Sequence, residues 1–181
     1  MDKAIITVLL IVAGVTCVVV MFNGIFPAIT RGSDAVVSMA SQVDDRIKSQ
    51  VSIVHAVSEY DPNDAVDYWN DINSNGDFDI FAWVKNVGDS RILAVEKCDI
   101  FFGKEGDFQR ISHDDYVDPG VFPYWQDTLE DSAGEWGRGK TLKINIVYAD
   151  TFAASGMTAG TTYLVKVIIP NGISDEIYFS L

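Results

Sequence analysis

Five oxygen-bearing side chains recur at alternate positions in one short stretch of the 181-residue chain, as they do in a calcium loop. Gly76 stands at the sixth position of this stretch, where a calcium loop makes its sharp turn. The twelfth position, which holds a bidentate glutamate in an EF-hand, is Ala82. The candidate metal ligands are Asp71, Asn73, Asn75, Asp77 and Asp79.

A complete EF-hand is therefore excluded, and a calcium ion at this loop would need a carboxylate from elsewhere in the chain. The alternative is a β-turn at Asn75-Gly76, in which aspartate side chains accept hydrogen bonds from backbone amides. Calcium is the one cofactor that the sequence suggests.

The two histidines give no catalytic arrangement. His113 precedes Asp114 and Asp115, which is a weak metal pattern and is more typical of a solvated loop. His55 lies beside an apolar stripe and is more typical of a packing residue. The sequence has no glycine-rich phosphate loop and no Cys-x-x-Cys motif, so we do not expect an enzyme.

The element that must position everything else is the first apolar run. Residues 4–22 are nineteen consecutive residues without a charge, and a helix of that length spans about 30 Å, the thickness of a bilayer core. The run is longer than the hydrophobic region of a signal peptide and has only Lys3 as a positive flank, so we expect it to be retained. It needs cover, from lipid or from identical helices.

A second apolar pattern continues the helix. Pro27 follows Asn23-Gly24, so a kink or short break is expected near residues 23–27. Beyond Arg31, apolar residues recur every three or four positions to residue 54, with polar residues opposite them. We therefore predict a helical arm over residues 1–58. Its assembly interface is predicted to comprise Ile5, Leu9, Val12, Val19, Val36, Ala40, Val43, Ile47, Val51 and Val54.

Charge and aromatic residues divide the chain at the same place. Residues 1–58 carry four positive and four negative charges, so the formal net charge of −13 lies in residues 59–181. Only Phe22 and Phe26 of the aromatic residues precede residue 59. An acidic surface without a basic patch argues against nucleic acid as a partner.

The acidic part of the chain is predicted to be a β-domain. Residues 59–76, rich in Asp, Asn and Pro, are expected to form a linker and loop. Alternating apolar residues then predict strands within residues 77–111 and 141–181, with Asn171-Gly172 as a hairpin turn and residues 114–139 irregular. The predicted fold is α+β: a long N-terminal hydrophobic helix followed by an antiparallel, immunoglobulin-like β-sandwich over residues 77–181.

Four segments resemble the archaellin superfamily, which comprises archaellum filament subunits and FlaG-type accessory proteins. They are DDRIKSQVSIVH (residues 44–55), AWVKNVGDSRI (82–92), CDIFFG (98–103) and PNGISDEIYF (170–179). The sequence lacks a charged leader with a cleavage site before the apolar run. If Met1 is the initiator, that favours an accessory protein; if the numbering starts at a mature end, a filament subunit is favoured.

The resemblance implies a structural role without catalysis. The first expectation is an extracellular filament subunit at the cell surface, which polymerises with copies of itself through its N-terminal helices and sits in the cytoplasmic membrane before assembly. The alternatives are a FlaG-type envelope or stator protein that contacts other archaellum proteins or the surface layer, and a stalked calcium-dependent binding module.

Overall fold

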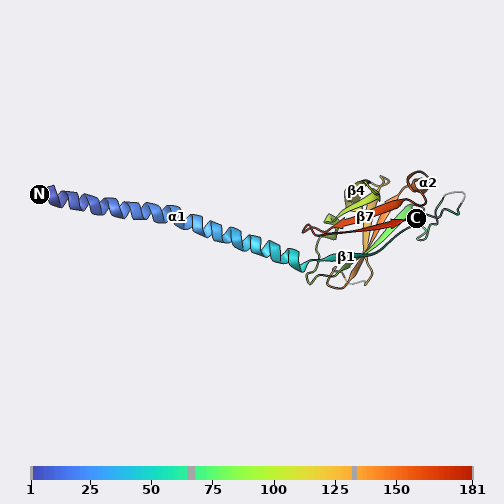
Figure 1. Ribbon diagram of the computed structural model, residues 1–181, viewed down its shortest axis with the longest axis horizontal. Coiled ribbons are helices and arrows are strands. Elements are labelled where there is room, and N and C mark those ends of the chain that lie inside the picture. Colours follow the sequence, from blue (N-terminus) through green and yellow to red (C-terminus); the bar gives the residue numbers. More distant parts are fainter. Residues whose placement is uncertain (1, 65–67, 132–133, 181) are drawn as a thin grey trace. The chain divides into compact units, whose positions relative to one another are not determined.

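The computed structural model describes residues 2–64, 68–131 and 134–180, which form two compact units that meet between Asp44 and Asp45. The first unit is helical. The second unit contains the last helical turn and all the strands that the structure describes, and we call it the β-domain (Figure 1).

Helix α1 (Asp2–Lys48) has 47 residues and is long and apolar enough to cross a membrane. The threonine hydroxyls of its apolar run do not interrupt the apolar surface, because each bonds to a carbonyl one turn earlier. Thr7 Oγ1 donates to the carbonyl of Lys3 at 2.8 Å, and Thr16 Oγ1 donates to that of Val12 at 2.8 Å. The apolar run therefore presents no hydroxyl that needs an outside partner.

The helix continues through Pro27 without interruption, so of the kink or short break expected at residues 23–27 the break is absent. Proline removes the hydrogen bond that its own nitrogen would donate to the carbonyl of Asn23, and a threonine three residues later adds a side-chain contact to the helix backbone. Thr30 Oγ1 lies 3.2 Å from the carbonyl oxygen of Phe26 and 3.1 Å from that of Pro27.

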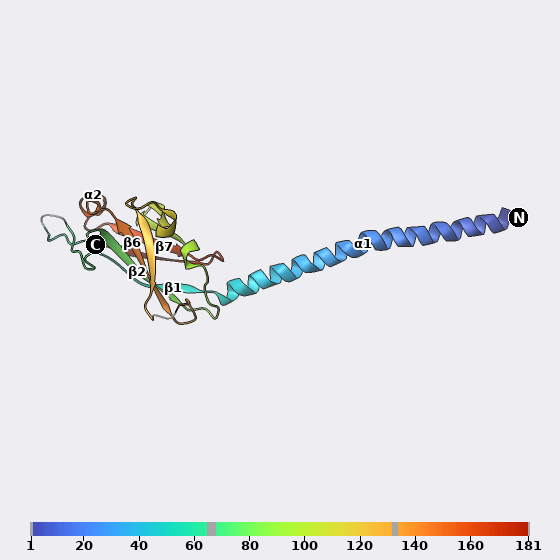
Figure 2. The ribbon, with the colours of Figure 1, turned by 180° about the vertical axis from the view of Figure 1, so that it is seen from behind.

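The β-domain contains eight strands and three short helices within the described residues. The strands are β1 (Val51–Ser58), β2 (Phe78–Asn86), β3 (Asp99–Lys104), β4 (Asp107–His113), β5 (Tyr124–Leu129), β6 (Thr141–Tyr148), β7 (Thr162–Ile168) and β8 (Ser174–Ser180). The helices are η1 (Val95–Lys97), η2 (Asp114–Tyr116) and α2 (Phe152–Gly156). The strand order is β1-β2-β6-β5-β4-β3-β7-β8, and Figure 2 shows β2 and β6 next to each other.

All pairings are antiparallel except the one between β4 and β5. That parallel ladder has only two residue pairs, Ser112 with Tyr124 and His113 with Trp125. It joins two antiparallel halves, β1-β2-β6-β5 and β4-β3-β7-β8, and we call it the seam. The predicted fold class, a long hydrophobic helix followed by an antiparallel β-domain, is confirmed.

The outer strands of the two halves, β1 and β8, nearly close the sheet. The amide of Ile53 on β1 donates to Oδ2 of Asp175 on β8 at 2.7 Å. A side chain thus occupies a backbone donor of an edge strand, which protects that edge from pairing with another chain. The core contains side chains from both halves, among them Ile80 and Ile144 from one and Ile100 and Phe102 from the other.

Three sequence predictions about the boundaries were wrong. The helix ends at Lys48, and β1 occupies the last eight residues of the predicted helical arm. Val51 and Ile53 point into the core, and a bulge after Ile53 leaves Val54 exposed. The β-branched residues of this segment therefore form a strand, although their spacing also fits a helix. Residues 59–76 do not link the helix to the β-domain, because they connect β1 to β2 within it.

The third error is β5, which lies in the segment expected to be irregular. Of its residues, only Trp125 is buried, so its sequence shows little apolar alternation. Its position depends on pairing with β6 and on the seam.

The end of α1 is held by backbone contacts with the loop after β2. The carbonyl of Lys48 accepts from the amide of Asp89 at 2.8 Å, and that of Gln50 accepts from Gly88 at 3.0 Å. A side chain at Gly88 would have no room, because a Cβ atom there would lie 2.4 Å from the carbonyl oxygen of Lys48.

We expect Gly88→Ala to destabilise the β-domain by about 1–3 kcal/mol, because the new methyl group meets backbone that cannot rotate away. Gly137→Ala is the matched control, since a Cβ atom there has nothing within 4 Å. Urea unfolding followed by tryptophan fluorescence measures both. Equal midpoints for the two variants would contradict this view of the junction.

Candidate functional site

The surface of α1 is the largest candidate site, and it has two zones. From residue 5 to residue 29, all sixteen large apolar side chains are more than half exposed, and they surround the helix on every side. From residue 31 onward, the large apolar side chains become sparser and alternate with charged residues. A helix that is apolar all round is found inside a protein assembly or a membrane.

The structure places seven of the ten predicted interface residues as large exposed side chains on α1: Ile5, Leu9, Val12, Val19, Val36, Val43 and Ile47. Ala40 is also exposed on this helix. Val51 and Val54 are not part of the helical surface. Val51 is 5% exposed in the β-core, and Val54 lies at the bulge of β1.

The second candidate site is the loop between β1 and β2, where the predicted calcium ligands lie. Asp71 accepts hydrogen bonds from the amides of Asn75 at 3.2 Å and Gly76 at 2.9 Å. Asn75 Oδ1 accepts from the amide of Asp77 at 2.9 Å, and Gly76 has a φ of +83°. The sharp turn at this glycine is therefore present, with side chains that cap backbone donors.

Two buried acids close this loop, and the sequence identified only one of them. Glu59 is 2% exposed, and its carboxylate accepts from the amides of Ile72 at 2.9 Å and Asp79 at 3.0 Å. Asp79 is fully buried, and its Oδ2 accepts from the side-chain amides of Asn73 and Asn75. Glu59 is the further carboxylate that a calcium ion at this loop would need.

Asp79 has an unsatisfied oxygen. Its Oδ1 atom and the side-chain oxygen of Asn145 are both buried without a donor in this geometry, and the side chain of Asn145 is a neighbouring group whose hydrogen bonding lowers the pKa of Asp79, against the larger effect of burial, which raises it. A buried oxygen without a donor costs free energy, which a bound cation can offset. The donor set of carboxylate and amide oxygens is the type that calcium takes.

Three acids at this loop, Glu59, Asp77 and Asp79, hold their protons more tightly than usual. Burial raises the pKa of Glu59 from 4.5 to about 7, against the lowering effect of its two amide hydrogen bonds. Burial also raises the pKa of Asp79, and burial followed by the charges of Asp150 and Asp71 raises the pKa of Asp77. The loop therefore disfavours its own negative charge when no cation is bound.

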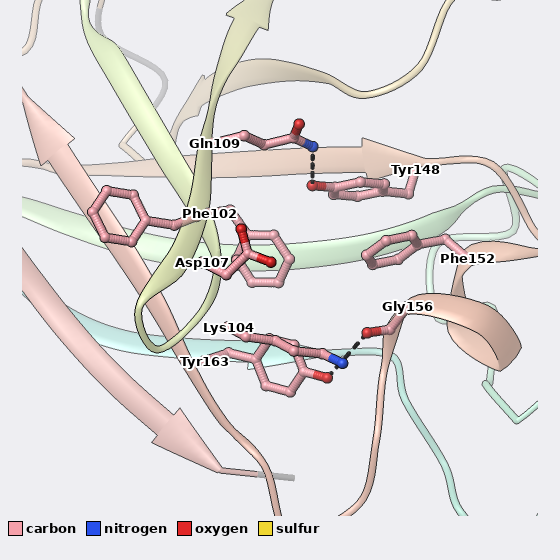
Figure 3. A pocket seen from close by; sticks show the side chains of 10 residues that line it. Phe102, Lys104, Asp107, Gln109, Tyr148, Phe152, Gly156 and Tyr163 are labelled. Atoms are coloured by element: carbon pink, nitrogen blue, oxygen red, sulfur yellow. Dashed lines mark hydrogen bonds between the residues drawn. The ribbon is translucent and has the colours of Figure 1, made fainter.

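A third feature is an aromatic cavity of about 290 Å³ between the β3–β4 hairpin and α2 (Figure 3). The rings around it contact one another: Tyr148 and Phe152 stack with centroids 3.8 Å apart, and Phe102 stacks on Tyr163 at 5.9 Å. The hydroxyl of Tyr163 donates to the carbonyl of Gly156 at 3.1 Å. These contacts attach α2 to the sheet. The aromatic rings around the cavity pack against one another.

No protein-family model matches the chain, and no curated protein matches its sequence. Several solved structures have a similar fold. FlaG, the archaellum periplasmic stator protein from Sulfolobus acidocaldarius, is 21% identical, with a TM-score of 0.51, and the match covers 72% of this chain and 99% of that one.

The archaeal flagellum of Methanospirillum hungatei strain JF1 matches helix and β-domain together. It is 13% identical, with a TM-score of 0.54, and the match covers 99% of this chain and 92% of that one. The fold is that of the archaellum proteins. A chain in the periplasmic stator complex of FlaF and FlaG from Sulfolobus acidocaldarius also has this archaellum fold, at 22% identity and a TM-score of 0.50, over 72% of this chain and 88% of that one.

Sequence reasoning missed Glu59 because this residue precedes the loop by twelve positions and belongs to no spacing pattern. Its role depends on the antiparallel pairing of β1 with β2, which brings Ser58 opposite Ile80 and so places the next residue beside Asp79. If residues 51–58 had been predicted as a strand from their β-branched residues, the carboxylate of Glu59 directly after that strand would have been the signal.

The raised pKa of Glu59 predicts a pH dependence of stability. Between pH 4.5 and about 7 the folded chain keeps a proton that the unfolded chain has lost, so the free energy of unfolding falls as pH rises through this window. Glu59→Gln should flatten this slope in metal-free buffer, whereas Glu105→Gln, an exposed control, should leave it. Urea midpoints across the window measure the effect, and a slope in Glu59→Gln as steep as in the wild type would contradict it.

Proposed function

We propose that this chain is a structural subunit of an archaellum-like extracellular filament, which polymerises through α1. The observation that carries the proposal is the ring of exposed apolar side chains around residues 5–29. Covering them with neighbouring helices is worth about 1.5–3 kcal/mol for each large side chain, so on the order of tens of kcal/mol per chain. Such a polymer would be difficult to dissociate.

Two further observations support polymerisation. The match to the Methanospirillum hungatei flagellum extends over the helix as well as the β-domain, with 99% of this chain covered. The edge of β1 is also partly occupied by Asp175, so the β-domain is not built to polymerise by strand addition at that amide. Assembly then depends on α1, and this helix lies in the membrane before the chain assembles.

A FlaG-type stator is the alternative, favoured by the higher identity of the FlaG matches. In that role α1 would remain a single membrane span, and the β-domain would contact another archaellum protein or the surface layer. Shearing of cells separates the two functions. A filament subunit leaves with the sheared material, and a stator stays in the membrane fraction.

Val43→Asp should abolish assembly, because it places a charge on the apolar side of α1, where neighbouring helices would bury it. Ser41→Asp is the matched control, since it adds the same charge about 160° around the helix. Sedimentation after detergent removal measures assembly of the full chain, and near-UV circular dichroism verifies the β-domain. Polymers of Val43→Asp in wild-type amounts would contradict the proposal.

The β1–β2 loop supports a second proposal, that the β-domain binds calcium at Asp71, Asn73, Asn75, Asp77 and Asp79 with Glu59 as the closing carboxylate. The buried Oδ1 of Asp79 without a donor favours it. Calcium in excess over a chelator should raise the melting temperature by about 5 °C, because it binds only the folded loop.

Asp79→Asn should remove this calcium response, whereas Asp107→Asn, an exposed acid outside the loop, should keep it. Differential scanning calorimetry of the full chain in detergent measures both. A wild-type melting temperature that is the same in calcium and in chelator would show that the loop is held by its hydrogen bonds alone.

A further inference from the structure

His113 lies at the seam between the two halves of the sheet, with carboxylates on both sides of its ring. It is the last residue of β4, is 7% exposed, and packs edge to face on Trp125 of β5 with ring centroids 4.4 Å apart. Its Nε2 atom lies 3.1 Å from Oδ1 of Asp127. An ionised carboxylate only accepts hydrogen bonds, so this contact places the ring proton on Nε2 and leaves Nδ1 with a lone pair.

Two more carboxylates face that lone pair. Oδ1 of Asp114 lies 2.9 Å from Nδ1, and Oδ2 of Asp115 lies 3.5 Å from it. The amide of Asp115 also lies 3.2 Å from Nδ1 and donates to it. The amide proton of Asp115 occupies this lone pair and offsets part of its repulsion with the carboxylate oxygens, so a cation at Nδ1 would take the place of that hydrogen bond.

We propose that His113, Asp114 and Asp115 bind a divalent transition-metal ion, with zinc as the natural occupant. Zinc binds imidazole nitrogen and carboxylate oxygen at about 2.0–2.2 Å, so two ligand atoms on one tetrahedral ion lie about 3.3–3.6 Å apart. The distance from Nδ1 to Oδ2 of Asp115, 3.5 Å, is of this size, and the distance to Oδ1 of Asp114, 2.9 Å, is shorter, so the Asp114 carboxylate would move back slightly to share an ion. One nitrogen and two oxygen ligands suit zinc, manganese or iron better than calcium.

The groups behind the ligands are arranged as in metal sites. Asp127 holds the ring through Nε2, which is the carboxylate–histidine pairing that fixes the tautomer of a metal-binding histidine. Gln126 donates to Oδ2 of Asp114 at 3.1 Å, which leaves Oδ1 directed toward His113. Both supporting residues are on β5, whereas the ligands come from β4 and η2.

The site is open on one side. A cavity of about 330 Å³ borders His113, Asp115 and Asp127, and Asp115 is mostly exposed. Water from this cavity would complete the coordination of an ion that has three protein ligands. Glu96 also lines the cavity and adds to the negative potential that attracts a cation.

The location gives the ion a structural role. The seam is a ladder of only two residue pairs, and one of them is His113 with Trp125. An ion held by β4 and η2, with its histidine fixed by β5, would strengthen this join between the two halves. Metal binding should therefore raise the melting temperature of the β-domain.

The test is titration of the full chain in detergent, stripped with a chelator, with zinc chloride, followed by calorimetry and thermal melting. We expect one zinc ion per chain and a rise in melting temperature of about 5 °C at saturation. Cobalt(II) as a second probe should give visible absorption bands, which zinc then removes. Absence of zinc binding, as expected if a proton alone bridges Nδ1 and the carboxylates, would overturn the proposal.

Variants locate the ion. His113→Gln should abolish binding, whereas His55→Gln, which removes the chain's only other histidine, should not. Asp115→Asn, at an exposed position that the fold does not need, should weaken zinc binding at least tenfold, and Asp118→Asn should leave it unchanged. Zinc binding that is unaffected in Asp115→Asn, or lost in His55→Gln, would overturn the assignment even if His113→Gln fails to fold.

Discussion

The structure depends on one constraint, which is that α1 cannot remain in water. Sixteen large apolar side chains lie exposed around a single helix between residues 5 and 29, and within that stretch the threonine hydroxyls bond to the helix itself. The free energy that would be gained by covering this surface exceeds the net stability of a typical domain, about 5–15 kcal/mol. Whatever covers the helix therefore determines the state of the whole protein.

The β-domain, in contrast, is complete by itself. Its core contains side chains from both halves of the sheet, and the edges formed by β1 and β8 are joined through Asp175. Within the β-domain, the last residue of α1, Lys48, accepts a backbone hydrogen bond from the amide of Asp89 in the loop after β2. The β-domain can thus be displayed by an assembled helix without taking part in its packing.

The acidic groups of the β-domain are arranged in two places where negative charge is held close together. In the β1–β2 loop, Glu59 and Asp79 are buried and their pKa values are raised. At the seam, Asp114 and Asp115 face the ring of His113. The first set offers only oxygen ligands and the second includes a nitrogen, so the two sets would select different cations.

The sequence predicted those features that depend on local pattern. Length and hydropathy identified α1, alternation identified β6, and the dipeptide Asn171-Gly172 identified the β7–β8 turn. Features that depend on distant partners were missed. Val51 fits a helical stripe as well as a strand, and pairing with β2 determines the outcome. The carboxylate of Glu59 reaches Asp79 only because β1 and β2 are adjacent.

Electron cryomicroscopy of the full chain, imaged after slow removal of detergent in the presence of phospholipid vesicles, tests the central claim most directly. Given both forms of cover, the chain should form filaments, with the α1 helices packed together at the centre and the β-domains outside. Single chains inserted in the vesicle membranes, with no filaments beside them, would show that lipid is the cover and would contradict the account.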